Sequence, residues 1–318
     1  MKKLILSALA AATVCTVYAQ SNTLSLSQKG NDNQSAATQK GKANSLTMSL
    51  IGNSNITRDV NNSFGPAVQK GNGNTGSMAV TGDNNQVYFN ENGVNNNLTL
   101  SMTGNSNLGF IYTTDEVNKT GNQVALVQVG TNNFGSAGVA SGSYNEISLT
   151  QVGNSNSGTA FAESGSYNEV RVKQIGDNNN GGASTDNSNS SHATLTQTGN
   201  YNYGFAGSIY GASNQASVIQ TGDNNIGEAF SISGSYNQVS LTQRGNMNEA
   251  RFKQDGSFNA ANMLQEGNSN KLAGLASPYA IQQGNGNALT LTQTGDGNVL
   301  HFGQMGNNNT ATVMQGSN

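Results

Sequence analysis

The chain has 318 residues, of which 10% are charged and 40 are glycine, and it has no tryptophan. Its 14 basic and 17 acidic residues give a net charge of −3. This balance argues against a nucleic-acid partner, because phosphate-binding proteins carry a basic patch or stripe. A single cysteine excludes a disulfide framework and a cysteine-based metal site.

Residues 1–19 have the pattern of a secretory signal. Two lysines precede a mostly apolar run at residues 4–17, and a small-residue cleavage site lies before Gln20. The run is too short for a stable membrane span. A lipid-anchored Cys15 is an alternative that the preceding Val14 disfavours. After cleavage, 12 basic and 17 acidic residues remain, a net charge of −5.

The rest of the chain, residues 20–318, repeats an eleven-residue unit, N-x-h-x-h-x-Q-x-G-x-x-N, where h is apolar. Such internal repetition has to be recognised before any other feature is interpreted. We call the glutamine position the anchor of each unit. There are 24 anchors, at residues 28, 39, 50, 69, 80, 91, 102, 128, 140, 151, 163, 174, 186, 197, 209, 220, 232, 243, 254, 265, 282, 293, 304 and 315.

Each unit predicts one half-buried β-strand and one tight turn. In the unit anchored at Gln151, the alternate residues Asn145, Ile147 and Leu149 share one face with the anchor. The opposite positions of the units carry Ser, Thr, Lys, Arg and Glu, which is typical of a solvent face. The glycine and the Asn-rich segment after it supply the backbone freedom of a turn.

A single strand and turn cannot bury a face alone, so the units are expected to stack into a solenoid. Five consecutive 23-residue steps, from anchor 128 to anchor 243, predict coils of two strands. The alternate strand has its own signature, N-x-G-x-A, as in Asn156, Gly158 and Ala160. Large residues on one sheet then face Gly and Ala on the other. The predicted fold class is all-β: an uncapped, amyloid-like, two-sheet β-solenoid with 22–23 residues per coil.

Buried amides at a fixed phase predict ladders of identical side chains, spaced by the ~4.8 Å between strands. A disordered polar tract, which composition alone suggests, is disfavoured because the apolar residues also keep a fixed phase. Uncapped first and last strands make candidate polymerising edges at Gln28, Gln39, Gln304 and Gln315. The candidate ladder residues are Asn145, Gln151, Gly153, Asn156, Asn168, Gln174, Gly176, Gln197, Gln220, Asn237, Gln243, Gln254, Gln265, Gln293 and Gln304.

Three steps between anchors are too long. We interpret them as corner insertions near residues 56–66, 108–118 and 271–281, with linkers between separate domains as the alternative. The two prolines, Pro66 and Pro278, lie in two of these stretches, where they interrupt no strand ladder. The middle stretch also predicts a degenerate unit ending at Asn122.

The chain offers little for catalysis. His192 and His301 occupy outward positions far apart, and Glu91 and Asp186, at two anchors, are too distant for a sugar-cleaving carboxylate pair. We therefore predict no enzyme, no catalytic residue, no cofactor and no small-molecule substrate. Gly-Asp pairs resemble those of calcium-binding rolls, but the period is eleven rather than nine, so no metal site is expected. These pairs are 82–83, 176–177, 222–223 and 295–296.

Tyr144, Tyr167 and Tyr236 share the corner sequence Gly-Ser-Tyr-Asn. Two interpretations stay open for these surface aromatics: packing within the turns, or an aromatic strip for adhesion. Outward Phe161 and Phe230 add a second apolar patch, suited to lateral bundling.

The repeat resembles that of the curlin family, the subunits of bacterial curli fibres. Gln28-Lys-Gly30-Asn-Asp-Asn33 and Gln151-Val-Gly153-Asn-Ser-Asn156 match the family's Q-x-G-x-x-N core. Asn replaces Ser at the strand start, and N-x-G-x-A stands where the family has N-x-A. The resemblance implies a self-assembling subunit of an extracellular functional-amyloid fibre in the biofilm matrix. It also implies secretion through an outer-membrane channel and nucleation by a minor subunit.

Two departures from the family leave details open. The chain has about twelve two-strand coils against the family's usual five or so repeats, and it lacks the Gly-rich N-terminal export segment. The export route is therefore undecided. The alternatives to a bulk fibre subunit are a fibre nucleator and a soluble β-solenoid adhesin or ice-binding protein. An ice-binding protein would carry a flat outward Thr array, whereas the outward positions here are mixed.

Overall fold

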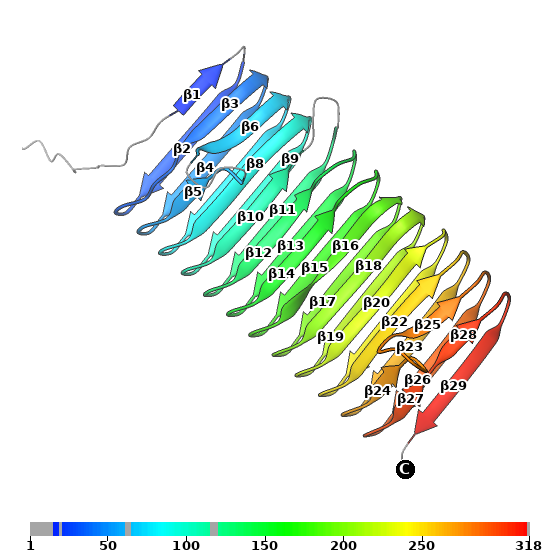
Figure 1. Ribbon diagram of the computed structural model, residues 1–318. Coiled ribbons are helices and arrows are strands. Elements are labelled where there is room, and N and C mark those ends of the chain that lie inside the picture. The colour runs from blue at the N-terminus through cyan, green and yellow to red at the C-terminus, as the bar shows by residue number, and fades with distance from the viewer. Residues whose placement is uncertain (1–14, 19–20, 61–64, 115–119, 317–318) are drawn as a thin grey trace, which may run out of the picture.

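The computed structural model describes residues 15–18, 21–60, 65–114 and 120–316. In this part of the chain two parallel β-sheets, which we call A and B, stack into a β-solenoid of about 12 turns (Figure 1). The predicted fold class is confirmed. Among the described residues, no helix has the length and apolarity that a membrane crossing requires. We call each strand level of a sheet a rung.

The chain alternates between the sheets, and every strand pair is parallel. Sheet B contains, in order, β2 (Thr23–Lys29), β4 (Ser45–Ile51), β7 (Thr75–Thr81), β9 (Asn97–Thr103), β11 (Gln123–Val129), β13 (Glu146–Val152), β15 (Glu169–Ile175), β17 (His192–Thr198), β19 (Gln215–Thr221), β21 (Gln238–Arg244), β23 (Ala260–Glu266), β26 (Ala288–Thr294) and β29 (Thr310–Gly316).

Sheet A contains the remaining described strands. They are β1 (Cys15–Tyr18), β3 (Ala37–Lys42), β5 (Ile56–Arg58), β6 (Ala67–Asn72), β8 (Gln86–Val94), β10 (Leu108–Thr113), β12 (Phe134–Val139), β14 (Ser157–Ala162), β16 (Asn180–Asn189), β18 (Tyr203–Ala212), β20 (Ile226–Ser233), β22 (Glu249–Asp255), β24 (Lys271–Ala273), β25 (Ala280–Gln283), β27 (Val299–His301) and β28 (Gly303–Met305).

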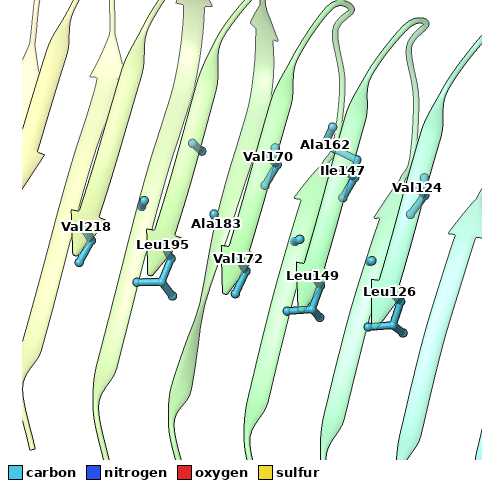
Figure 2. Packing of buried hydrophobic residues seen from close by; sticks show 14 of the residues in the cluster. Val124, Leu126, Ile147, Leu149, Ala162, Val170, Val172, Ala183, Leu195 and Val218 are labelled. Atoms are coloured by element: carbon cyan, nitrogen blue, oxygen red, sulfur yellow. The ribbon is translucent and has the colours of Figure 1, made fainter. Parts of the chain in front are cut away.

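The core is a thin apolar layer between the two sheets. Leu126, Leu149, Val172 and Leu195 occupy equivalent positions on the successive sheet B strands β11, β13, β15 and β17 and are buried, as the side chains in Figure 2 illustrate. A Cβ atom added to Gly158 of sheet A would lie 2.8 Å from Leu149 Cδ1. The sheets are therefore as close as a glycine permits, as the predicted large-against-small pairing requires.

Tight stacking also fixes the glycine of each turn. Gly153 has φ +119°, and a Cβ there would lie 2.1 Å from the carbonyl oxygen of Gly176 in the next coil. Ser155, two residues on, has a left-handed φ of 55°. The Gly-x-x-Asn turn thus needs glycine for its conformation and for the close passage of the next backbone.

The structure corrects the position of two insertions. β8 pairs with both β5 and β6, and β22 pairs with both β24 and β25. The insertion between β5 and β6 and the insertion between β24 and β25 therefore each interrupt a single rung of sheet A. Neither lies at a corner. β10 is the degenerate unit of the middle stretch, whose residues 115–119 lie outside the described residues.

Five anchors were also misplaced by one residue. Along the middle of sheet A, the residue before the expected anchor is the buried one. The inward side chains there are in phase with the Asn, Gly and Ala of the N-x-G-x-A signature, and the expected anchor is out of phase with them. The buried residues are Val139, Ala162, Thr185, Ser208 and Ser231. Asp186 consequently points outward, whereas Glu91 is buried.

Most of the predicted signal, residues 1–14 and 19, lies outside the described residues. Cys15–Tyr18 forms β1, which pairs in parallel with β3, with Val17 opposite Gln39. The cleavage of this segment stays a prediction.

Candidate functional site: amide ladders and open strand edges

A continuous ladder of glutamine amides runs along sheet B. Gln128 Nε2 donates to Gln151 Oε1 at 2.9 Å, and the same bond repeats at 2.8–2.9 Å up to Gln315. The second amide proton goes to the backbone of sheet A, as from Gln151 Nε2 to the carbonyl oxygen of Phe134 at 2.8 Å. Within the ladder the buried amides are thereby satisfied, apart from the Oε1 of Gln128 at its start, and the two sheets are joined. The ladder members are Gln128, Gln151, Gln174, Gln197, Gln220, Gln243, Gln265, Gln293 and Gln315.

Shorter ladders run along the two ends of sheet A. Near the C-terminus, Gln254 donates to Gln282 at 2.9 Å and Gln282 to Gln304 at 2.8 Å. Near the N-terminus, Gln39 Nε2 donates to Gln69 Oε1 at 2.7 Å. Opposite this N-terminal ladder, sheet B carries apolar residues at its anchors: Leu50, Val80 and Met102. The repeat pattern did not predict that the buried glutamines lie in sheet A at the N-terminal end, in sheet B in the middle and in both sheets at the C-terminal end.

Asparagines form a ladder at each corner. The backbone N–H and the Nδ2 of Asn156 both donate to Asn133 Oδ1, at 3.0 and 3.1 Å, and Nδ2 also donates to the carbonyl oxygen of Gly176 at 2.7 Å. Asn145, Asn168 and Asn237 likewise donate Nδ2 to the carbonyl oxygen of a turn residue one coil on. Each asparagine thus fastens its own turn to the neighbours on both sides.

Glu91 is the one carboxyl group of the described residues found in a glutamine ladder position. Its side chain is fully buried, and its Oε2 accepts a hydrogen bond of 2.7 Å from Gln69 Nε2. Burial raises the pKa of this carboxyl from 4.5 to about 8, against the smaller lowering by the Gln69 hydrogen bond. Glu91 is therefore protonated at neutral pH. Asp186, on β16, lies four rungs from β8, so the structure does not bring these two acids together.

The two ends of the solenoid expose complementary atoms. Within the described residues β2 pairs only with β4, and β29 only with β26. At the β2 end the Nδ2 of Asn22 is buried without a partner, and so is the Nε2 of Gln28, whose register partner in the next coil is the apolar Leu50. Gln39, one rung inside the edge formed by β1, has an unpaired Oε1. At the β29 end, Gln315 accepts from the ladder, while Gln304 ends the sheet A ladder.

The corner tyrosines form stacked pairs. The rings of Tyr144 and Tyr167 lie 5.2 Å apart at 12°, and those of Tyr236 and Phe258 lie 5.2 Å apart at 8°. The three tyrosines are 53%, 63% and 60% exposed, and each has φ near +60°. The rings therefore pack between adjacent turns in two separate exposed pairs, with Ser190 and Ser213 at the equivalent positions between them, and a role in adhesion stays a prediction. Phe258 was missed because its turn, Asp-Gly-Ser-Phe-Asn, departs from the Gly-Ser-Tyr-Asn sequence by its Phe.

The other polar residues singled out in the sequence have structural partners. Asp177 Oδ1 accepts the backbone N–H of Asn154 at 2.7 Å, and Asp83, Asp223 and Asp296 accept equivalent bonds. These aspartates thus take the place of turn asparagines. His192 and His301 are both exposed. The described part of the chain contains no cluster of three or more His, Cys, Asp or Glu side chains placed to hold a metal ion.

The curlin associated repeat matches residues 145–176, 188–222, 234–267 and 284–316. A comparison with curated proteins gave no match. The first matched segment begins with Asn145 and contains the Gln151, Gly153 and Asn156 whose ladder bonds are described above. The chain is therefore a curlin-repeat protein, with several copies of the family's unit.

Proposed function

We propose that the protein is a structural subunit of an extracellular, curli-like amyloid fibre of the biofilm matrix. The subunits assemble by stacking the β29 edge of one copy on the β2 edge of the next. The curlin repeats and the β-solenoid fit such a subunit. The observation that carries the proposal is the match between the two open edges of sheet B.

The backbone of β29 is oriented to bind a further strand. The N–H of Ala288, at the start of β26, donates toward β29, to the carbonyl oxygen of Asn309, at 2.8 Å. In a parallel strand alternate residues direct their backbone groups to the same side. By the equivalence of the rungs, Thr310, Thr312 and Met314 direct theirs to the open edge. Asn22, the counterpart of Asn309, supplies the first acceptor in the next copy.

The side chains continue across the same junction. With Gln315 above Gln28, Val313 meets Leu26 and Ala311 meets Leu24, so the apolar layer is unbroken. Gln315 Nε2 then donates to Gln28 Oε1, as every earlier ladder glutamine does. Asn22 Nδ2, unpaired within one copy, donates to Asn309 Oδ1. In sheet A, one strand position stays empty between β28 and β3 at this junction, because β1, the strand that pairs with β3, belongs to the segment expected to be cleaved and is absent from the chain that begins at Gln20.

Such a junction joins two different surfaces and stacks each copy along the solenoid axis of the last, so copies add in a line and growth continues indefinitely. Long, regular ladders suit the bulk subunit of a fibre better than its nucleator. By resemblance to curli subunits, the proposal includes secretion across an outer membrane, a secretion channel and a nucleator subunit as partners. Its partner in the fibre is the next copy of itself.

The test is the assembly of the chain from Gln20 onward, diluted out of denaturant. We expect dye-binding fibres with a ~4.8 Å meridional reflection. Thr312→Pro removes a backbone donor from the open edge alone, so we expect a folded chain that forms no long fibres. Thr312→Ala is the matched control and assembles. A wild-type chain that stays a folded monomer for days at high concentration would overturn the proposal and favour a soluble solenoid.

A further inference from the structure

The outer face of sheet A carries a belt of aromatic side chains on β8, β10, β12 and β14, and a second stacked pair, Phe205 and Phe230, lies further along on β18 and β20. Tyr88 and Phe110 stack at 4.6 Å and 6°, and Phe110 lies 5.8 Å from Phe134. On the same face, two residues further along β10, Tyr112 lies 6.0 Å from Phe161. A Cβ added to Gly138, between these two, would lie 2.7 Å from the Tyr112 ring. The rings therefore lie down over the sheet and form a flat apolar surface.

Two lysines lie on one side of this belt and two acidic residues lie on the other side. All four occupy equivalent positions along the strands, on the same face of sheet A. Lys40 and Lys70 are register partners on adjacent rungs, and both are exposed. Glu163 follows the buried Ala162, and Asp186 follows the buried Thr185. Because Ala162 and Thr185 are register partners, the two acidic residues lie at equivalent positions on adjacent rungs. Along sheet A the rungs run β3, β6, β8, β10, β12, β14, β16. Lys40 and Asp186 are thus each three rungs from β10, and Lys70 and Glu163 each two.

We propose that the outer face of sheet A binds the same face of a second copy, antiparallel, about a two-fold axis that runs along β10. This axis brings Lys40 opposite Asp186 and Lys70 opposite Glu163 of the second copy. Phe110 and Tyr112 meet their own counterparts at the centre. Such a contact is isologous, so every pair forms twice. The inference rests on the proposed function, because it makes this contact the lateral bond between fibres.

The shape of the face agrees with this arrangement. A hollow of about 330 Å³ lies on β10 to β18, lined by Tyr112, Ser136, Phe161 and Asp186, among others. The same axis places it opposite the interrupted rung of the second copy. There the Asp59 N–H donates to the Gly65 carbonyl oxygen, and Asp59 Oδ1 accepts from outward Asn90. Asp59 and Asn90 at that rung therefore face the hollow rather than the aromatic belt.

The first test reverses the charges. In 50 mM salt we expect Lys40→Glu/Lys70→Glu fibres to stay single, with lateral association at least about tenfold weaker than in wild type. Glu163→Lys/Asp186→Lys fibres behave likewise. An equal mixture of the two variants pairs again, because each negative face meets a positive one. Mass per length by electron microscopy measures the pairing. Unchanged pairing in either variant, or a mixture that stays single, would overturn the inference.

The second test fixes the direction of the pairing. The chain from Gln20 has no cysteine, so single cysteines report on one contact. We expect Lys70→Cys chains to form disulfides with Glu163→Cys chains and not with each other. Crosslinking of Lys70→Cys chains to themselves alone would overturn the antiparallel arrangement.

These outcomes are separable from those of the proposed function. Charge reversal leaves the ~4.8 Å reflection and fibre growth unchanged, because the edges of sheet B are untouched. If the chain forms no fibres, the fibre proposal fails, and sedimentation of the soluble chain still decides the pairing: a dimer that charge reversal dissociates supports it, and a monomer refutes it.

Discussion

Gln69 donates a 2.7 Å hydrogen bond to the fully buried carboxyl group of Glu91. In every other link of the glutamine ladders a neutral amide accepts this bond. An ionised carboxylate here is costly because no cation compensates it in an apolar layer. Because the pKa of Glu91 is about 8, its carboxyl group ionises, at this cost in free energy, just above neutral pH.

We therefore expect the stability of the solenoid to fall as the pH rises from about 4.5 to about 8. In this window the folded chain keeps a proton on Glu91 that the unfolded chain releases, so raising the pH favours unfolding. The slope is about 1.4 kcal/mol per pH unit for this group, and it vanishes above the folded pKa. The guanidinium midpoint of folded chains at pH 5, 7 and 9 measures it.

Glu91→Gln removes this dependence, because glutamine continues the ladder of Gln39 and Gln69 without a titrating group. The exposed Glu266→Gln is the matched control and keeps the wild-type slope. A Glu91→Gln chain with the same pH dependence as wild type would show that the carboxyl is not the cause.

Much of this arrangement was readable from residue spacing, because each unit folds by the same local rules. Period two, the turn glycine and the 23-residue step predicted the strands, the corners and the two-strand coil. The one-residue shift at Val139 was not predicted. There no glutamine marks the buried position, and both Val139 and Ala140 are apolar. The insertion near residues 271–281 was predicted at a corner, and its place within a strand was not foreseen, because only pairing with β22 shows that β24 and β25 belong to one rung.

The middle of the sheet B ladder should tolerate no apolar substitution. Gln174 accepts from Gln151 at 2.8 Å and donates to Gln197 and to the Ser157 carbonyl at 2.9 Å. Gln174→Leu leaves buried donors and acceptors unpaired, at a cost of about 2–4 kcal/mol in the free energy of unfolding. Met102→Leu is the control, because Met102 is the apolar register partner of Gln128 in the preceding coil, and it costs less than about 1.5 kcal/mol. Equal losses in denaturant midpoint would contradict a hydrogen-bonding role.

The stability cost of replacing a turn glycine should depend on how closely the next coil approaches it. Gly153→Ala places a Cβ on the Gly176 carbonyl oxygen at φ +119°, so we expect a loss of at least about 3 kcal/mol. At Gly297, with φ +70°, nothing lies within 4 Å of an added Cβ. Gly297→Ala should therefore cost only about 1–2 kcal/mol, the usual penalty of a left-handed alanine. Thermal unfolding of both variants measures the difference, and similar losses would mean that coil stacking is not the constraint.

Replacing a tyrosine that has a left-handed φ should change the stability by an amount that depends on whether its ring stacks on another. Tyr201, with φ +58°, lies on a corner between Asn178 and Asn224 of the adjacent coils. Because asparagine adopts this conformation more readily, Tyr201→Asn should stabilise the chain by up to about 1 kcal/mol. Tyr167→Asn should gain less, because it loses a ring stack with Tyr144 worth about 0.5–1.5 kcal/mol. A larger gain for Tyr167→Asn would argue that the stacked pair contributes nothing to turn packing.

Blocking one edge should stop growth at substoichiometric amounts. A Thr312→Pro chain keeps an intact β2 edge, so it can add to the β29 end of a wild-type fibre. It then presents an edge without the Thr312 donor, and the next copy cannot complete the junction. One such chain per twenty wild-type chains should therefore shorten fibres markedly, as measured by electron microscopy, while Thr312→Ala at the same ratio leaves their length unchanged. If Thr312→Pro shortens fibres no more than this control does, growth does not proceed through the open edge of β29.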